Sequence, residues 1–289
     1  MFINPISYPG NKNKLLKQLI SEFPTDINVF VDVFCGSGVV GANSSANTVI
    51  CNDICKACTD IFQYFYNNPF GEILAELEKV INYYHLSYTH RDGKTYIEQK
   101  HEGLSRVNRD QYNQLKHDYN LNPSTDKLII LSIYGFNHYI RFNKKGFFNV
   151  PVGKVDLSTS IFKNLEQFIN HIKSKRLLFK NSDFRDAGLY TYQDAIYYFD
   201  PPYLITTAPY NLGWSEKDEE DLLNLLDRLD GENKKFCLSN VFLSNGKENK
   251  RLIEWSKKYK TVLMKRQYRN ANYQKINITD TIEVIVKNF

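Results

Sequence analysis

Residues 27–41 read Ile-Asn-Val-Phe-Val-Asp-Val-Phe-Cys-Gly-Ser-Gly-Val-Val-Gly, and this stretch decides the fold class. Its apolar first half is typical of a buried strand, a turn containing Gly36 and Gly38 follows, and a helical run begins after the turn. Glycines at such a turn let the backbone approach a ligand closely, as in dinucleotide-binding folds. The stretch therefore predicts the strand, loop and helix that open an α/β domain with a ligand at the loop.

The next apolar run, 48–51, leads into Asn52-Asp53. An acid at the end of the second strand can bind the hydroxyl groups of a ribose, which NAD and S-adenosylmethionine (SAM) both carry. The segment 6–16, Ile-Ser-Tyr-Pro-Gly-Asn-Lys-Asn-Lys-Leu-Leu, precedes the first strand. A dehydrogenase has no need of such a segment, so the N-terminus favours SAM over NAD.

A later apolar run, 194–199, leads into Asp200-Pro201-Pro202-Tyr203, a pattern typical of enzymes that methylate an exocyclic amino group. The adenine N6 lone pair is delocalised into the ring, so the amine becomes nucleophilic only when acceptors hold its hydrogens. Asp200 is one such acceptor and the carbonyl of Pro201 is the other. The two prolines fix φ and remove two N–H donors, and Tyr203 can stack on a base swung out of a duplex. A rigid turn at the end of a strand is the alternative interpretation.

The order of apolar and amphipathic segments predicts an α/β sheet with helices on both faces. Strands are predicted near 29–34, 48–51, 176–180, 194–199, 234–239, 260–266 and 281–287. Helices are predicted between them, near 14–22, 54–67, 215–229 and 246–258.

Residues 57–175 interrupt this alternation with helical patterns near 70–84, 109–119, 126–139 and 158–173. We interpret them as an inserted, mainly helical target-recognition domain for DNA, with 1–56 and 176–289 forming a SAM-binding catalytic domain. Lys144-Lys-Gly146 lies between 140–142 and 147–150, which predicts a β-hairpin whose tip enters a DNA groove. A surface hairpin without this role is the alternative.

The sequence holds 37 Lys and Arg against 32 Asp and Glu, a net charge of +5. Basic residues concentrate in 134–180 and 257–275, mixed with Tyr, Phe, Asn and Gln. A phosphate backbone attracts such a surface, although a solvated helix face has the same composition. We expect a cytoplasmic protein with no membrane contact, because we find neither an apolar run long enough to span a bilayer nor a signal-peptide pattern.

Together these motifs resemble the Dam-type DNA adenine-N6 methyltransferases (D12 class, alpha group), and most closely the phage members. The likeness covers nearly the whole sequence. It includes the aromatic-x-Gly-x-Lys element at 8–12 and the motif Arg-Phe-Asn-x-Lys-Gly-x-Phe-Asn-Val-Pro-x-Gly-Lys at 141–154. The sequence departs from the family at Val155, where phage members often carry a basic residue, and in 86–110, which is longer than usual.

The resemblance implies a Rossmann-like SAM-dependent methyltransferase that flips an adenine out of double-stranded DNA and methylates N6 by direct in-line transfer, without a metal. GATC is the family's commonest target, and a restriction endonuclease can accompany such an enzyme. The residues expected to carry out catalysis are Asp200, Pro201, Pro202 and Tyr203. The residues expected to bind SAM are Tyr8, Gly10, Lys12, Phe34, Gly36, Gly38, Asp53, Asp183, Phe184 and Asp200, with Lys12 near the SAM carboxylate. The residues expected to bind DNA are Asn137, Arg141, Asn143, Lys144, Lys145, Asn149, Pro151 and Lys154.

Three alternatives stay open. One is methylation of another exocyclic amine, such as cytosine N4 or an RNA base, and a second is a DNA-binding module that has lost catalysis. The third rests on Cys51, Cys55 and Cys58, whose C-x3-C-x2-C spacing is that of the [4Fe–4S] cluster in radical-SAM enzymes. Against it, Cys51 falls inside a predicted strand, and reduced cysteines commonly pack as small hydrophobic residues.

Overall fold

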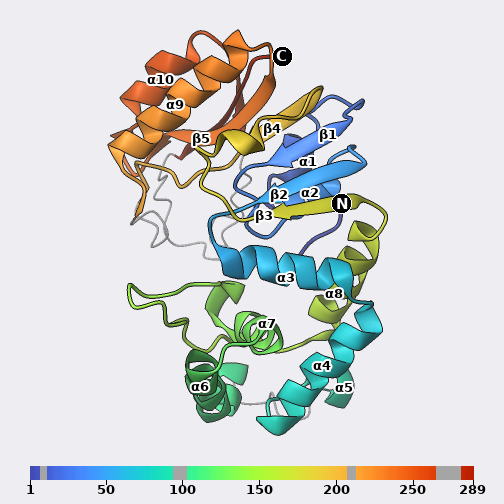
Figure 1. Ribbon diagram of the computed structural model, residues 1–289. Coiled ribbons are helices and arrows are strands. Elements are labelled where there is room, and N and C mark those ends of the chain that lie inside the picture. The colour runs from blue at the N-terminus through green and yellow to red at the C-terminus, as the bar shows by residue number, and fades with distance from the viewer. Residues whose placement is uncertain (7–11, 94–102, 207–212, 265–280) are drawn as a thin grey trace.

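The structure is a computed structural model that describes residues 1–6, 12–93, 103–206, 213–264 and 281–289 (Figure 1). Within these ranges the strands form one eight-stranded sheet in the order β3-β2-β1-β4-β5-β8-β7, and β6 pairs with β5. The strands are β1 (Val29–Asp32), β2 (Thr48–Asn52), β3 (Arg176–Lys180), β4 (Ala195–Phe199), β5 (Lys235–Ser244), β6 (Lys247–Glu248), β7 (Lys260–Met264) and β8 (Ile282–Lys287).

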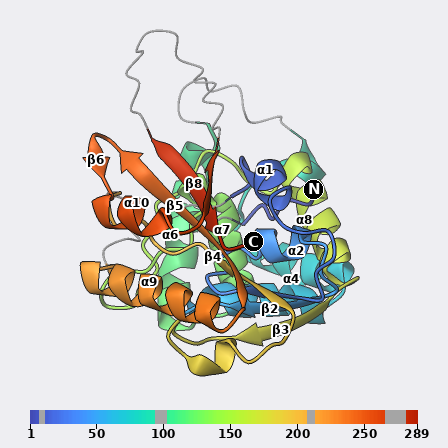
Figure 2. The ribbon, with the colours of Figure 1, turned by 90° about the horizontal axis from the view of Figure 1, so that it is seen from above.

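The strands alternate their side chains between two apolar cores, one on each face of the sheet. In β1, Phe30 packs into the first core and Val31 into the second, and in β4 Tyr198 and Phe199 divide in the same way. The second face is covered by α9 (Glu216–Gly231) and α10 (Lys250–Ser256). The first is covered by α1 (Leu16–Ile20), α2 (Val39–Asn43), α3 (Lys56–Asn67) and α8 (Thr159–Ile172). Figure 2 shows α1, α2 and α8 on this side of the sheet. The predicted α/β fold with helices on both faces is confirmed.

The arrangement of β1 and β4 determines where a ligand can bind. The strands β3, β2, β1, β4 and β5 are parallel, and β8 runs antiparallel between β5 and β7. From β1 the chain proceeds outward to β2 and β3, and then returns to place β4 on the other side of β1. The carboxyl ends of β1 and β4 therefore form a topological switch point, where open α/β sheets bind ligands.

Helices fill most of the chain between β2 and β3. They are α3, α4 (Phe70–Tyr83), α5 (Thr89–Asp92), α6 (Leu104–Leu121), α7 (Thr125–Tyr134) and α8. Figure 1 shows α4 to α7 gathered on the far side of α3 from the sheet. The buried face of α7 packs into the same apolar core as the sheet residues Phe30 and Val49, so the helices and this sheet face are continuous.

The hairpin predicted at 140–150 is present but shorter than predicted: its two arms are antiparallel, and the N–H groups of Asn143 and Asn149 donate to the carbonyls of Phe147 and Arg141 at 2.8 and 3.2 Å. Phe142 and Phe148 form one isolated bridge instead of a ladder. The Asn143 side chain accepts hydrogen bonds from the backbone N–H groups of Lys145 and Phe147. These bonds hold a compact turn and take backbone groups that a regular two-stranded ladder uses.

Two predicted helices have different ends in the structure. The helix predicted to reach 139 ends at Tyr134, because Gly135 has extended backbone and a short 3-10 segment, Phe136–His138, follows. The helix predicted from 246 begins at Lys250, because β5 continues to Ser244 and pairs with β6. Across the described ranges, no helix has both the length and the apolarity to span a membrane.

Candidate active site

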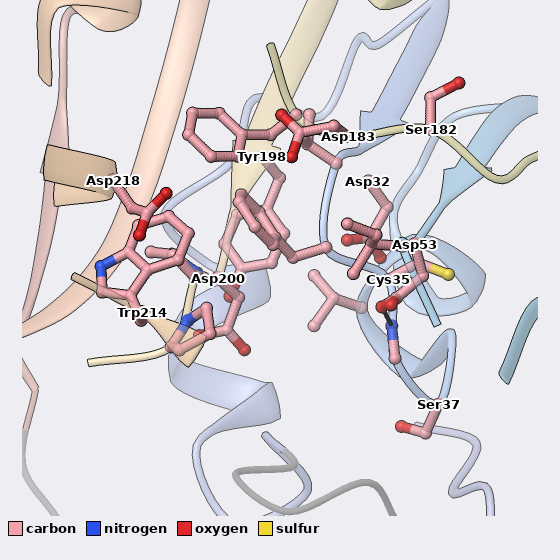
Figure 3. A pocket seen from close by; sticks show the side chains of 18 of the residues that line it. Asp32, Cys35, Ser37, Asp53, Ser182, Asp183, Tyr198, Asp200, Trp214 and Asp218 are labelled. Atoms are coloured by element: carbon pink, nitrogen blue, oxygen red, sulfur yellow. Dashed lines mark hydrogen bonds between the residues drawn. The ribbon is translucent and has the colours of Figure 1, made fainter. Parts of the chain in front are cut away.

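A cavity of about 350 Å³ opens at the switch point (Figure 3). Its walls come from Lys12, from the loops after β1, β2, β3 and β4, and from the residues around the start of α9. The fold thus gathers predicted site residues from sequence positions far apart. Those that line the cavity are Lys12, Phe34, Gly36, Asp53, Asp183, Phe184, Asp200, Pro201, Pro202 and Tyr203.

Three predicted cofactor residues are not among the lining residues. Tyr8 and Gly10 lie outside the described residues. Gly38 has φ +71°, and a Cβ atom built on it would lie 2.0 Å from the ring of Phe62 in α3. Gly38 is therefore required by the turn that begins α2 and by the close approach of α3.

Asp53 is a buried carboxylate held by the loop after β1. Its Oδ2 accepts the N–H of Gly36 at 2.8 Å and its Oδ1 accepts the N–H of Cys55 at 2.8 Å. Burial raises the pKa of Asp53, and these two hydrogen bonds oppose that rise. The carboxylate therefore fixes the backbone of the glycine loop at the cavity wall.

Asp32, at the end of β1, is a lining residue that the sequence prediction missed. Its side chain is 1% exposed, and Oδ2 accepts the N–H of Gly41 at 3.1 Å. Its Oδ1 has no hydrogen-bond partner in the described part of the chain. Burial raises the pKa of Asp32 to about 8, and the charges of Asp200 and Asp53 add to the rise. The available signal was an acid inside an otherwise apolar strand, Val-Phe-Val-Asp-Val-Phe.

Asp200 is bound by two donors that converge on one oxygen. Lys12 Nζ lies 2.5 Å from Asp200 Oδ1, and the Tyr203 hydroxyl donates to the same atom at 3.0 Å. Lys12 also donates to the Tyr203 oxygen at 2.6 Å. The structure therefore places the Lys12 ammonium against the catalytic motif. Among the described residues, Asp200 Oδ2 accepts no hydrogen bond, so this oxygen is the one left for a substrate.

The charges and rings around the cavity favour a cationic ligand with an aromatic part. Five aspartates line it against two basic residues, Lys12 and Arg185, so acidic side chains outnumber basic ones at its wall. The ring centroid of Trp214 lies 5.9 Å from that of Phe34 and 5.4 Å from that of Phe184, which makes an aromatic wall. Next to this wall, Asp183 Oδ1 accepts from the backbone N–H of Arg185 and from its guanidinium. The five aspartates are Asp32, Asp53, Asp183, Asp200 and Asp218.

The predicted DNA-binding residues form a separate group that does not line the cavity. Arg141 donates through Nε to Asn149 Oδ1 at 2.8 Å and through Nη2 to the Asn149 carbonyl at 3.1 Å, which closes the turn 141–149. Asn137 has φ +56° in the 3-10 segment. The other members of the group are exposed and are Asn137, Asn143, Lys144, Lys145, Asn149, Pro151 and Lys154.

The cysteines with cluster spacing lie on two elements: Cys55, at the N-cap of α3, is in side-chain contact with Cys58 of the same helix, and Cys51 belongs to a strand. Cys51 is buried in β2 and Cys58 is buried in α3. In the part of the chain that the structure describes, no three His, Cys, Asp or Glu side chains are grouped so that they could hold a metal ion.

The family model of the D12 class N6 adenine-specific DNA methyltransferases matches residues 8–272. The chain belongs to this family. It is 33% identical to the Type II methyltransferase M.FokI of Planomicrobium okeanokoites and 32% identical to the modification methylase StsI of Streptococcus sanguinis. Each match covers 99% of this chain and 43% of the relative, so the chain spans less than half the length of these two proteins. A DNA adenine methylase of Haemophilus influenzae is 26% identical over 68% of this chain and 63% of its own.

These matches confirm the D12 class that the motifs resemble. The D12 relatives include Type II methyltransferases as well as DNA adenine methylases. Closest likeness to the phage members, and membership of the alpha group, stay predictions.

Proposed function

We propose that the chain is a site-specific DNA adenine-N6 methyltransferase that takes its methyl group from SAM. One observation carries the proposal: Asp200 of the Asp-Pro-Pro-Tyr motif lies in the same cavity as the buried acids Asp32 and Asp53. Membership of the D12 class supports the reaction. The modification methylases among its relatives support double-stranded DNA as the substrate and a restriction endonuclease as a partner.

The lining residues fit SAM, whose sulfonium and ammonium groups are cationic. Asp32 has a buried oxygen without a partner among the described residues, which suits an ammonium donor. We assign the ribose hydroxyl groups to Asp53, a buried carboxylate that lines the same cavity. The wall of Phe34, Phe184 and Trp214 suits the adenine ring, with Asp183 beside it as an acceptor.

The residues of the motif orient and activate the target amine. When bound, SAM would supply the methyl group of its sulfonium: the N6–CH3 bond would form in line as the S–CH3 bond breaks, S-adenosylhomocysteine would leave, and the methylated amine would release one proton to solvent. Lys12 and Tyr203 hold Asp200 through Oδ1, so Oδ2 is free to accept one hydrogen of the adenine N6 amine. The carbonyl of Pro201 accepts the other. The rate gain then comes from positioning and from preorganised acceptors, and the reaction requires no metal and no covalent intermediate.

DNA contact is assigned to the exposed basic turn 141–149 and to Lys154. Lys144 and Lys145 are exposed there, and a positively charged turn is attracted to phosphates. We assign residues 57–175 to target recognition, and 1–56 with 176–289 to SAM binding and catalysis. GATC is the proposed target. Val155 stands where phage members often carry a basic residue, and this difference affects how the outer base of GATC is recognised.

The test is to incubate the protein with DNA and SAM carrying a labelled methyl group, and to digest the product to nucleosides. Label in N6-methyl-2′-deoxyadenosine is the expected result, and base-modification sequencing then gives the site. Label in N4-methyl-2′-deoxycytidine, or faster labelling of RNA in a parallel incubation, would contradict the assignment to DNA adenine. Binding to DNA without any SAM binding would indicate a module that has lost catalysis.

A further inference from the structure

Glu219 of α9 is a fully buried carboxylate. It is 0% exposed, and it forms no ion pair with any residue in the described ranges. Its Oε2 accepts from Trp214 Nε1 at 2.9 Å, and its Oε1 accepts from Asn249 Nδ2 at 2.9 Å and from Asn240 Nδ2 at 3.4 Å. Burial raises the pKa of Glu219, and these hydrogen bonds oppose the rise. A buried ion without an ion-pair partner, favoured only by the charge of Arg251 beyond ion-pair distance, is unfavourable for stability, so stability alone does not account for this residue.

The surrounding donors require a side chain that only accepts hydrogen bonds. The amide oxygen of Asn240 accepts the N–H of Val241 at 2.8 Å, and that of Asn249 accepts the N–H of Leu252 at 3.1 Å. Both amides therefore turn their NH₂ groups toward Glu219. A glutamine at this position would bring its own NH₂ group against one of three donors.

The three donors come from parts of the chain that surround the site. Trp214 lines the main cavity, where its ring packs on Phe34 and Phe184. Asn240 lies in β5 and lines a second, small cavity together with Lys12 and Tyr203. Asn249 is the N-cap of α10. The Glu219 carboxylate thus connects Trp214, on the cofactor side of the site, with Asn240, behind the catalytic motif.

We propose that Glu219 is a positioning residue for methyl transfer. It fixes the Trp214 indole as the wall of the cofactor cavity, and it fixes Asn240 behind Tyr203, without itself lining the main cavity. This inference rests on the proposed function, because the ligand at the wall is taken to be SAM. The consequence is that loss of the carboxylate weakens SAM binding although no group that lines the main cavity is removed.

The test compares Glu219→Gln with Glu220→Gln, its neighbour on α9, which lies half exposed 3.7 Å from Arg251. The sequence has two tryptophans, so Trp255→Phe is introduced throughout to leave Trp214 as the fluorophore. Glu219→Gln should raise the KM for SAM about 10-fold with a smaller change in kcat, because it leaves a buried donor unsatisfied. The Trp214 emission should shift to the red in the absence of any ligand. Glu220→Gln should match the parent in both measurements.

Trp214→Phe keeps a ring but removes the N–H donor, and it provides a second route if Glu219→Gln does not fold. It should raise the KM for SAM by a similar factor, and the effect of the double variant should be smaller than the product of the two single effects, because both variants perturb the contact between Trp214 and Glu219. Unchanged KM and unchanged emission in Glu219→Gln, or an unchanged KM in Trp214→Phe, would overturn the role. If the parent protein transfers no methyl group at all, the proposed function fails, whereas the emission of Trp214 without ligand still reports whether Glu219 holds the indole.

Discussion

The cavity at the strand ends and the turn 141–149 hold their polar side chains in different ways. In the cavity, Asp32 and Asp53 are buried and bonded to backbone N–H groups of other segments. In the turn, Arg141 and Asn143 are bonded to residues of the same turn. The fold therefore preorganises the cavity, whereas the turn is held by its own side chains together with Asn120 of α6, whose amide bonds the backbone N–H and carbonyl of Phe148. Substitutions in the cavity should have large effects on chemistry, and substitutions in the turn should have smaller effects confined to DNA.

The largest effect is expected for Asp200→Ala. Turnover should fall by at least ~10²-fold while SAM affinity stays within several-fold, because a preorganised acceptor at the developing charge is worth roughly 3 kcal/mol or more. Single-turnover methyl transfer and calorimetric SAM titration measure the two quantities. Asp26→Ala, at an exposed position, serves as the control. Turnover close to that of the control would show that Asp200 is not the catalytic acceptor.

Asp53→Ala tests the cofactor side of the cavity. The change removes the proposed ribose acceptor and leaves the N–H groups of Gly36 and Cys55 without their partner. SAM should bind more weakly by about 1–3 kcal/mol, and DNA affinity should change little. Calorimetry with SAM and fluorescence anisotropy with a DNA duplex check this, against Asp60→Ala on the exposed side of α3. Equal SAM binding in both variants would show that the acid of the second strand does not hold the ribose.

Asp32 should make the cavity sensitive to pH. Its pKa is raised to about 8 in the folded protein, so the folded state keeps a proton that the unfolded chain releases above about pH 4. The stability of the ligand-free protein should therefore fall as pH rises from about 4 to about 8, and Asp32→Asn should flatten this part of the curve. A cationic ligand favours the carboxylate, so SAM affinity should rise with pH in the same range.

Thermal unfolding and SAM titration between about pH 6 and about pH 8 measure both trends. Asp53 and Glu219 are also buried acids with raised pKa values, so the informative quantity is the difference between the parent and Asp32→Asn. Parallel pH profiles in the two proteins would show that Asp32 does not titrate in this range.

The contrast between the cavity and the turn 141–149 also explains which features could be predicted from sequence. Strands buried on both faces appear as continuous apolar runs, so β1, β2 and β4 and the loops after them were predictable. β3 is an edge strand with exposed residues, and its short apolar run, Leu177-Leu178-Phe179, indicated it. The contact between Lys12 and Asp200 joins residues 188 positions apart, and only the folded chain shows it. Asp32 was missed because its chemistry depends on burial. The hairpin is shorter than predicted because the Asn143 side chain accepts the N–H of Phe147, which a longer ladder would use.

The smallest effects are expected in the DNA-binding group. Two variants there should lose different properties, one the general affinity for DNA and the other the discrimination between base pairs. Lys154 is exposed, so Lys154→Ala should weaken all DNA sequences alike and reduce the slope of log affinity against log salt by about 1. Arg141 closes the turn through Asn149, so Arg141→Ala should reduce discrimination by roughly 1–3 kcal/mol at one or two base pairs and leave much of the salt slope.

Asn149→Ala separates the two ways in which Arg141 can act. It removes the side-chain acceptor of Arg141 but keeps the guanidinium. If Arg141 shapes the turn, Asn149→Ala should lose discrimination at the same base pairs, and if Arg141 touches a base edge, the loss should be specific to Arg141→Ala. Binding assays with duplexes that differ at single base pairs, at several salt concentrations, give both quantities. If Lys154→Ala and Arg141→Ala lose only general affinity, the turn is a backbone clamp, and the residues that read the sequence lie elsewhere in 57–175.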